Sequence, residues 1–319
     1  VVNTYTLAPV VNNVFARRRL VRTLSRNILR NRLEIGRAGW WRTGFSALIS
    51  VIYFLPVLWI VITAFKPARD ALTLNLSFTP TLSNFAAIFR RAFHAGGEVM
   101  DTGFEHFFFN SVFIAGTSVG LALILGTAAA YGFSRWPLRG NDTYMFLILT
   151  TRMLPPIIVI IPIFIMFRLT GLAGSYLGII MLYTAFNLPF TIWMMKSFFD
   201  ELPREVEDAA RTEGSSEWRV FFRICLPQVK AGIAATVTFG LILTWNEFIM
   251  ALLLTGPETR TVPVAMGANL GGGFSVQWGL LAAIETLYLL PVVLVTFALQ
   301  NQLLRGVTFG TIRQRSPAN

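Results

Sequence analysis

Residues Asn110–Phe133 have the sequence NSVFIAGTSVGLALILGTAAAYGF, which contains no Asp, Glu, Lys or Arg. A helix rises about 1.5 Å per residue, so roughly 20 apolar residues cross the ~30 Å hydrocarbon core of a bilayer. Small side chains recur along this run at Gly116, Gly120, Gly126 and Ala130. Because small residues let helices approach closely in lipid, we expect a membrane-spanning helix that is buried in a helical bundle.

Five further apolar runs of similar length predict an all-α membrane protein with six spans. The expected spans are Phe45–Phe65, Asn110–Phe133, Tyr144–Phe167, Tyr176–Met195, Ala231–Leu254 and Leu280–Leu303. The composition agrees, since 54% of the 319 residues are hydrophobic and 13% are charged, with a mean hydropathy of +0.60. Too few charges remain to cover the surface of an ordinary water-soluble protein.

The basic residues predict the orientation of these spans. There are 27 Lys and Arg against 16 Asp and Glu, a net charge of +11. With the amino terminus in the cytoplasm, most basic residues fall in inner segments, as the positive-inside rule requires. We therefore expect both termini inside, with an Arg-rich segment at 1–44, a six-helix domain at 45–303 and a tail at 304–319. The excess of basic charge favours membrane lipid over nucleic acid as a partner.

The Arg-rich segment contains an amphipathic stretch, Phe15–Ile35. Its apolar residues share one helical face and its arginines lie largely opposite, which is typical of a helix on a membrane surface. An Arg-rich tail that only sets topology explains the composition equally well.

Prolines interrupt the third and fourth expected spans, at Pro155, Pro156, Pro162 and Pro189. Broken backbone at membrane depth requires protein or a water-filled cavity to satisfy the freed carbonyl groups. These positions fit either simple kinks or parts of a solute pathway.

Charged side chains at the same depth are expensive and are therefore candidates for function. Three residues qualify: Arg152, Glu247 and Glu285. Arg152 fits either a structural ion pair with one of the two acids or a contact to a solute.

The loop between the fourth and fifth spans, at 197–230, contains ELPREVEDAARTEGSSEWRVFFRICLP at Glu201–Pro227. Pro203 suits a first helical turn and Gly214 suits a helix end. Two pairs of opposite charge are spaced four apart, Glu207 with Arg211 and Arg204 with Asp208. We expect a short polar helix at the membrane face, which either docks a partner or only connects two spans.

The spacing in this loop resembles the EAA loop of ABC-importer permeases, whose pattern is Glu-Ala-Ala, three residues, Gly, nine residues, Ile, one residue, Leu-Pro. Here Asp208-Ala209-Ala210 is followed by Gly214, Ile224 and Leu226-Pro227 at those intervals. Asp208 stands where the family usually has Glu, and Glu213 where it often has Asp.

Other segments resemble the carbohydrate-uptake, maltose-type branch of these permeases. They are TRMLPP at Thr151–Pro156, the Leu188–Pro189 pair, WNEF at Trp245–Phe248, TRTVPV at Thr259–Val264 and RGVTFG at Arg305–Gly310. The resemblance covers nearly all of the chain after Tyr53.

The resemblance implies a six-transmembrane-helix type I ABC-importer permease with a cytoplasmic EAA coupling helix, in the bacterial inner membrane. It implies a sister permease, two ATPase subunits that hold ATP and Mg, and an extracytoplasmic solute-binding protein as partners. The implied contacts to an ATPase subunit are Arg204, Glu207, Asp208, Ala209, Ala210, Glu213, Gly214, Leu226 and Pro227. The acids Glu207, Asp208 and Glu213 would be read by basic residues of that partner.

No catalytic site, cofactor or metal is expected in this chain itself. Its three lysines, Lys66, Lys196 and Lys230, lie outside any GxxxxGK[ST] phosphate loop. The two histidines, His94 and His106, have no neighbouring carboxylate cluster in the sequence.

The resemblance also implies solute contacts in the spans on either side of the coupling loop. With the buried charges, the candidate pathway residues are Arg152, Tyr183, Asn187, Phe190, Trp245, Asn246 and Glu247. Aromatic rings stack on sugars and amides bind hydroxyl groups, so these types fit a polyhydroxy solute such as a disaccharide, oligosaccharide or polyol. Ordinary helix packing is the other explanation.

Two other classes of protein remain as alternatives. A secondary carrier or channel that is not driven by ATP would also use broken helices and buried charges, but it is usually built from more spans or from repeats. A membrane enzyme is disfavoured because HExxH and GxSxG motifs are missing.

Overall fold

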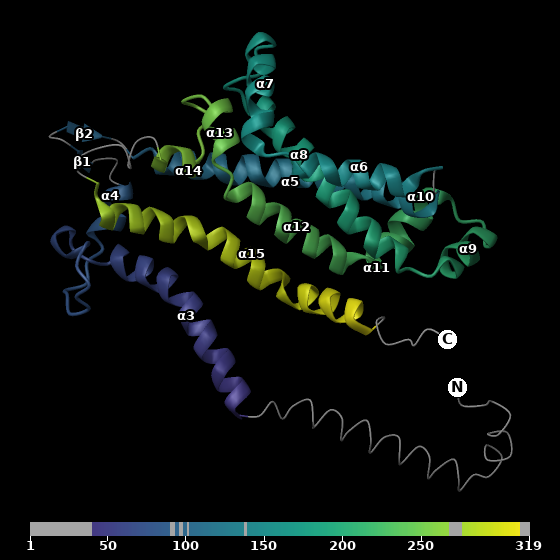
Figure 1. Cartoon of the computed structure of the whole chain (residues 1–319), viewed down its shortest axis with the longest axis horizontal. Helices are drawn as coiled ribbons and strands as arrows, with labels where there is room; N and C mark the ends of the chain where they lie inside the picture. The colour runs from purple at the N-terminus through teal and green to yellow at the C-terminus, as the bar shows by residue number, and fades with distance from the viewer. Residues whose placement is uncertain are drawn as a thin grey trace, which may run out of the picture. The chain divides into compact units, whose positions relative to one another are not determined.

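The computed structural model describes residues 40–89, 93–95, 98–100, 102–136, 139–267 and 276–312. The chain divides into two units, Val1–Ile60 and Val61–Asn319, and Figure 1 shows the elements by label. The amphipathic stretch Phe15–Ile35 lies outside the described residues. Helix α3 (Trp40–Ala64) is the first expected span and contains Pro56 without ending there.

Three further long helices belong to the second unit: α5 (Phe104–Arg135), α8 (Tyr176–Asp200) and α15 (Trp278–Ile312). Together with α3, they are the four described helices long and apolar enough to cross a membrane. Two bent helix pairs bring the number of spans to as many as six. The prediction of an all-α membrane fold of this size is therefore confirmed.

The third expected span is one of these bent pairs. Helix α6 (Asn141–Met153) meets α7 (Pro156–Leu169) at an angle of 88°. Pro156 opens α7 at a position where its missing N–H has no helical partner to lose. Pro162 and Pro189 lie inside α7 and α8, so the predicted interruption is wrong at those two positions.

The fifth expected span is broken as well. Helix α12 (Lys230–Trp245) ends at Asn246, and α13 (Ile249–Leu254) follows after a short break. At its other end α12 meets the segment Glu217–Gln228 at 72°. That segment consists of α10 (Glu217–Arg219), the π-helix η3 (Val220–Cys225) and α11 (Leu226–Gln228).

Short elements connect the long helices. They are η2 (Ala68–Asp70), α4 (Ser83–Phe89), β1 (Phe93–Ala95), β2 (Glu98–Met100), α9 (Arg204–Thr212) and α14 (Val262–Ala265). Strands β1 and β2 pair antiparallel with Phe93 opposite Met100, a small departure from the all-helical prediction.

Helices α5 and α8 lie side by side and carry the core of the second unit (Figure 1). A side chain at Gly126 would collide with Thr191 of α8, so this glycine does allow the close approach predicted for α5. Gly116 and Gly120 have open space around their Cβ positions. The small-residue prediction therefore holds for only part of the run.

Candidate functional site

The EAA-like motif forms the short helix α9. Pro203 precedes the helix, and Gly214 ends it with φ +85°. The Gly214 N–H donates to the Arg211 carbonyl and the Ser215 N–H to the Ala210 carbonyl, both at 2.9 Å. These bonds satisfy the last carbonyls of the helix, and the left-handed backbone at Gly214 favours glycine. The predicted helix and its end are confirmed.

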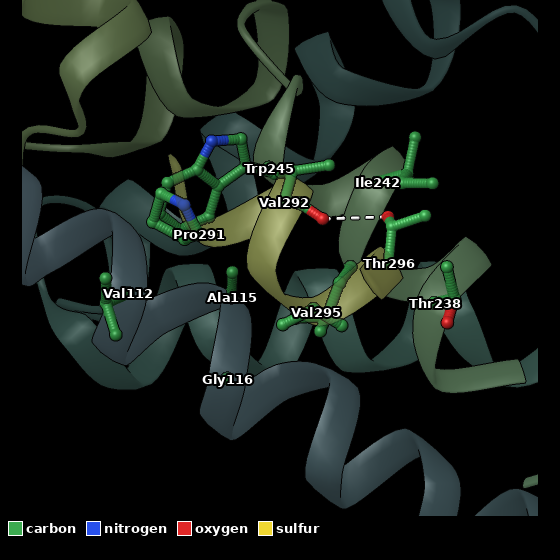
Figure 2. Close-up of a pocket in the computed structure, with 11 residues that line it drawn as sticks. Val112, Ala115, Gly116, Thr238, Ile242, Trp245, Pro291, Val292, Val295 and Thr296 are labelled. Atoms are coloured by element: carbon green, nitrogen blue, oxygen red, sulfur yellow. Dashed lines mark hydrogen bonds between the residues drawn. The ribbon is translucent and has the colours of Figure 1, made fainter. Parts of the chain in front are cut away.

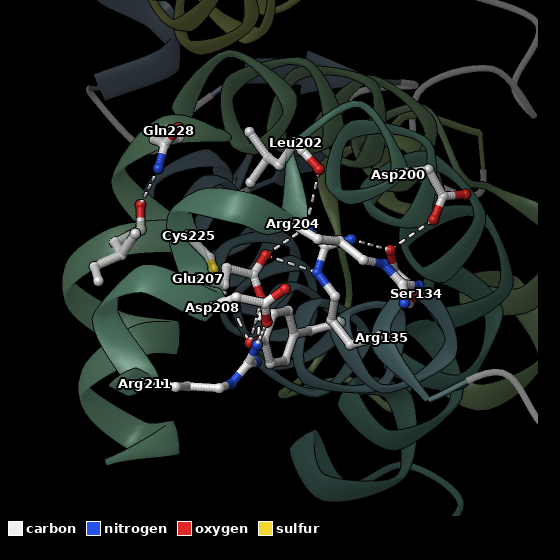
Figure 3. A network of polar contacts seen from close by, with 12 residues as sticks. Ser134, Arg135, Asp200, Leu202, Arg204, Glu207, Asp208, Arg211, Cys225 and Gln228 are labelled. Atoms are coloured by element: carbon white, nitrogen blue, oxygen red, sulfur yellow. Dashed lines mark hydrogen bonds and ion pairs between the residues drawn. The ribbon is translucent and has the colours of Figure 1, made fainter. Parts of the chain in front are cut away.

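A buried ion pair joins α9 to the end of α5 (Figure 3). Arg135 approaches Glu207 Oε1 with Nη2 at 2.6 Å and Nε at 2.7 Å. Tyr131 donates its hydroxyl to Glu207 Oε2 at 3.1 Å. The side chains of Arg135 and Glu207 are only 5% and 2% exposed. The prediction that Glu207 is presented to a partner is therefore wrong, because its carboxylate faces α5.

The ionisation of Glu207 depends on this pairing. Burial alone would raise the pKa of its carboxyl group, but the hydrogen bond and charge of Arg135 outweigh burial and hold the pKa below its ordinary value. The pair therefore stabilises the folded chain above the unfolded-state pKa, and the stabilisation is lost as the pH falls through the folded-state pKa.

Arg211 bonds three acids in and just after α9. It contacts Glu207 at 3.3 Å, Asp208 at 2.8 Å and Glu217 at 2.8 Å. The hydrogen bond that Arg211 donates to the Glu217 carboxylate raises the pKa of Arg211. The expected pair of Glu207 and Arg211 is confirmed. The pair of Arg204 and Asp208 is not formed, because Arg204 donates to the Ser134 carbonyl at 2.9 Å.

The remaining predicted coupling residues divide by exposure. Asp208, Ala209, Glu213, Gly214 and Pro227 are exposed. Ala210 and Leu226 instead pack in or against an apolar cluster that includes Tyr131, Phe199 and Val220. The exposed residues are available to a partner.

Four of the seven predicted pathway residues line one cavity of about 240 Å³: Arg152, Tyr183, Asn187 and Glu247. They come from α6, from α8 and from the break after α12, so the break in the fifth span supplies part of the wall.

Arg152 and Glu247 bind separate partners in this cavity. Arg152 Nη1 donates to the Phe186 carbonyl at 2.6 Å. Glu247 accepts bonds from the Tyr183 hydroxyl at 2.8 Å and from the Met250 and Ala251 N–H groups at 3.0 and 3.1 Å. Glu247 thus caps the start of α13, where a negative charge is stabilised. Of the two alternatives for Arg152, the ion pair with Glu247 or Glu285 is absent among the described residues.

Asn187 is buried between α8 and α12. Its amide nitrogen donates to the Tyr183 carbonyl and to Thr244 Oγ1, both at 2.8 Å. Its Oδ1 is buried on the side of Gly240 and has no hydrogen-bond partner within the described part of the chain.

The other three pathway residues do not line this cavity. Trp245 stacks on Tyr288 with ring centroids 4.7 Å apart and lines a separate, apolar cavity of about 220 Å³ (Figure 2). The rings of Phe190 and Phe239 pack with their centroids 6.0 Å apart. Asn246 is exposed, and its amide nitrogen donates to the Ile242 carbonyl of α12. Of these three residues only Trp245 meets any of the other four, because it lines a second, much smaller cavity together with Tyr183 and Glu247.

Sequence reasoning missed the two partners of Glu207, Arg135 and Tyr131, because they precede it by more than seventy positions. The available signal was the single arginine in the last turn of α5, two residues after the uncharged run Asn110–Phe133. Among the described residues, no group of three or more His, Cys, Asp or Glu could hold a metal ion.

Broken spans around a polar cavity, with a short polar helix fixed to the end of the bundle, define a membrane transport subunit. The family model described as "Binding-protein-dependent transport system inner membrane component" matches residues 118–309. The chain belongs to this family and is a transmembrane permease subunit.

Named relatives are similar over most of their length. The "Probable ABC transporter permease protein y4oR" of Sinorhizobium fredii is 33% identical over 273 residues, which are 85% of this chain and 94% of that protein. The "Diacetylchitobiose uptake system permease protein NgcG" of Streptomyces coelicolor is 29% identical over 83% of this chain and 86% of that protein.

A solved structure shares the fold. It is a bacterial ABC transporter involved in the import of the acidic polysaccharide alginate, with a TM-score of 0.64 and 20% identity. The match covers 82% of this chain and 95% of that chain.

Proposed function

We propose that this permease moves a carbohydrate, such as a disaccharide, oligosaccharide or polyol, inward across the bacterial cytoplasmic membrane by alternating access. The observation that carries the proposal is the α9 motif, held by a buried ion pair at the end of a spanning helix. The name of the related diacetylchitobiose permease supports a sugar as the solute.

In this proposal α9 and both termini face the cytoplasm. An ATPase subunit, which holds ATP and Mg, receives the exposed residues of α9, chiefly Asp208, Ala209 and Glu213. A sister permease completes the pathway, a second ATPase subunit serves that sister, and an external solute-binding protein delivers the sugar. The outer segments at 66–106 and 256–279 receive that protein, although the described residues cover them only in part.

The polar cavity is the proposed solute contact of this subunit. Arg152 donates hydrogen bonds, the Glu247 carboxylate accepts them, and the Tyr183 and Phe186 rings supply apolar surface. This combination suits the hydroxyl groups and C–H faces of a sugar ring.

Purification of the tagged chain from its own membranes tests the function. We expect a Walker-type ATPase to co-purify, and its ATP hydrolysis to rise when the binding protein and its sugar are added. Uptake that needs an ion gradient, with no associated ATPase, would instead establish the carrier alternative.

Replacement of Arg152 by glutamine tests the cavity. A hydrogen bond from a charged group contributes about 1.5–3 kcal/mol, so the half-saturation concentration for the sugar should rise roughly tenfold to a hundredfold. Arg168→Gln is the matched control, because Arg168 is an exposed arginine at the end of α7 outside the cavity. Equal uptake kinetics for both variants would remove the cavity from the pathway.

A further inference from the structure

We propose that Arg135 is the positioning residue that ties the coupling helix to the spanning helix α5, so that α9 and the adjoining ends of α5 and α8 move as one rigid unit. The inference rests on the proposed function, because it concerns how motion of a partner ATPase reaches the spans. It adds a residue and a route to that function: the force enters at α9 and passes directly into α5.

The guanidinium group of Arg135 is held on several sides. Its Nε and Nη2 both bind Glu207 of α9, at 2.7 and 2.6 Å. Its Nη1 donates to Ser134 Oγ at 2.9 Å, and Nη2 also lies 3.5 Å from the Leu202 carbonyl, in the connection between α8 and α9. Both bonds to Glu207 end on one oxygen, Oε1, and they are charge-assisted and therefore strong. Arg135 therefore restrains the position of α9 against the end of α5.

Ser134, in the same turn of α5, makes two further hydrogen bonds to neighbouring elements. Its hydroxyl donates to Asp200 Oδ1, at the end of α8, at 2.6 Å. Its carbonyl accepts from Arg204, at the start of α9, at 2.9 Å. One turn of α5 is thus bonded to the helix before the coupling loop and to the coupling helix itself (Figure 3).

Aromatic packing closes the side of the junction that faces the bundle. The Tyr131 ring lies 5.3 Å from Phe199 of α8 and 4.8 Å from Phe221 of η3, between ring centroids. The hydroxyl of the same ring binds Glu207. Elements on both sides of α9 in the sequence therefore pack on one residue of α5.

Burial makes the junction stiff. Separating Arg135 from Glu207 would leave charges without full compensation in a region that water does not reach, which is strongly unfavourable. The pair of Lys196 and Asp200 has the same 2.6 Å separation, but its side chains are 18% and 43% exposed. An exposed pair is screened and contributes little. Displacement of α9 should therefore carry the end of α5 with it instead of opening a gap between them.

A distance measurement on the assembled importer in lipid nanodiscs tests this unit. Spin labels are placed at Glu205→Cys in α9 and Ile124→Cys in α5, both exposed positions, in a Cys225→Ala background. Mg-ATP with vanadate is the probe, because it traps the ATPase without requiring the sugar. We expect the same distance between the labels in the nucleotide-free and trapped states.

Arg135→Gln should remove the ion pair that holds α9 to α5. In that variant we expect the distance distribution to shift and broaden on trapping only, with uptake lost while Mg-ATP hydrolysis continues. A merely structural role would change the distribution in both states alike. Lys196→Gln, the exposed-pair control, should behave like the parent. Arg135→Lys keeps the charge but lacks the planar guanidinium group, and it should give an intermediate shift. It replaces the glutamine variant if that variant does not assemble.

The outcomes separate the inference from the function on which it rests. A label distance in the parent that changes on trapping as much as in Arg135→Gln would overturn the rigid unit, and so would full uptake by Arg135→Gln. Both results would leave the ATPase-driven function intact. A parent complex that contains no ATPase subunit would instead overturn the proposed function.

Discussion

An importer that carries Ala210→Asp is expected to lose both assembly and transport. Ala210 is 9% exposed and packs in the apolar cluster with Tyr131 and Phe199. The new carboxylate would be buried there, one turn from the carboxylate of Glu207. Burying an ion without a partner costs several kcal/mol, a large share of the roughly 5–15 kcal/mol that keeps a domain folded.

The melting temperature of the purified chain and the amount of co-purified ATPase measure this effect, with sugar uptake as the functional readout. Ala209→Asp is the control, because Ala209 is the next residue and is exposed. Its effect on folding should stay within about 0.5 kcal/mol, and any loss of uptake should come from docking alone. Normal melting and uptake in the Ala210 variant would mean that α9 does not pack as described.

Much of the architecture could be predicted from local sequence. A continuous apolar run specifies a spanning helix, and the proline and glycine at its ends specify a short helix. The sequence therefore predicts α3, α5, α8, α15 and α9 at the right places, whereas the third and fifth expected spans are each divided in the structure. The break at Pro155 and Pro156 follows from the same local chemistry.

The direction of the charged side chains could not be predicted in this way. The resemblance implies that Glu207 faces a partner, and nothing near it in the sequence indicates a pairing with Arg135, which lies 72 positions earlier. Similarly, an ion pair with Glu247 or Glu285 is one prediction for Arg152, whereas its partner in the structure is the backbone carbonyl of Phe186. Every residue has a backbone carbonyl, so a pattern of side-chain charges cannot predict which carbonyl accepts the bond.

The motif WNEF shows how a helix break gives neighbouring residues different contacts. The resemblance makes Trp245 a pathway candidate, and a charge at membrane depth makes Glu247 one. The helix ends between them, at Asn246, so Trp245 packs against Tyr288 while Glu247 turns to the start of α13. Both residues still line one small cavity with Tyr183, so the break changes their packing and hydrogen-bond partners and does not move them into different regions.

Gly214→Asp should abolish uptake while leaving the chain folded and inserted in the membrane. The left-handed backbone at φ +85° costs an ordinary residue about 1–2 kcal/mol, and Asp tolerates this region better than most. Apart from the neighbouring residues of the chain, no atom of the described residues lies within 4 Å of the position that a Cβ would occupy. The chain itself therefore has room for the side chain, and the expected loss must arise where a partner approaches the helix end.

Gly214→Asn is the matched control, because asparagine has nearly the same size and the same tolerance of left-handed backbone but no charge. Melting temperature, co-purified ATPase and uptake are measured for both variants. Retained uptake in the asparagine variant would assign the effect to the charge, and loss in both would assign it to steric exclusion of the partner. Uptake at the parent rate in the aspartate variant would show that no partner approaches closely at Gly214, and the docking role of α9 would have to be abandoned.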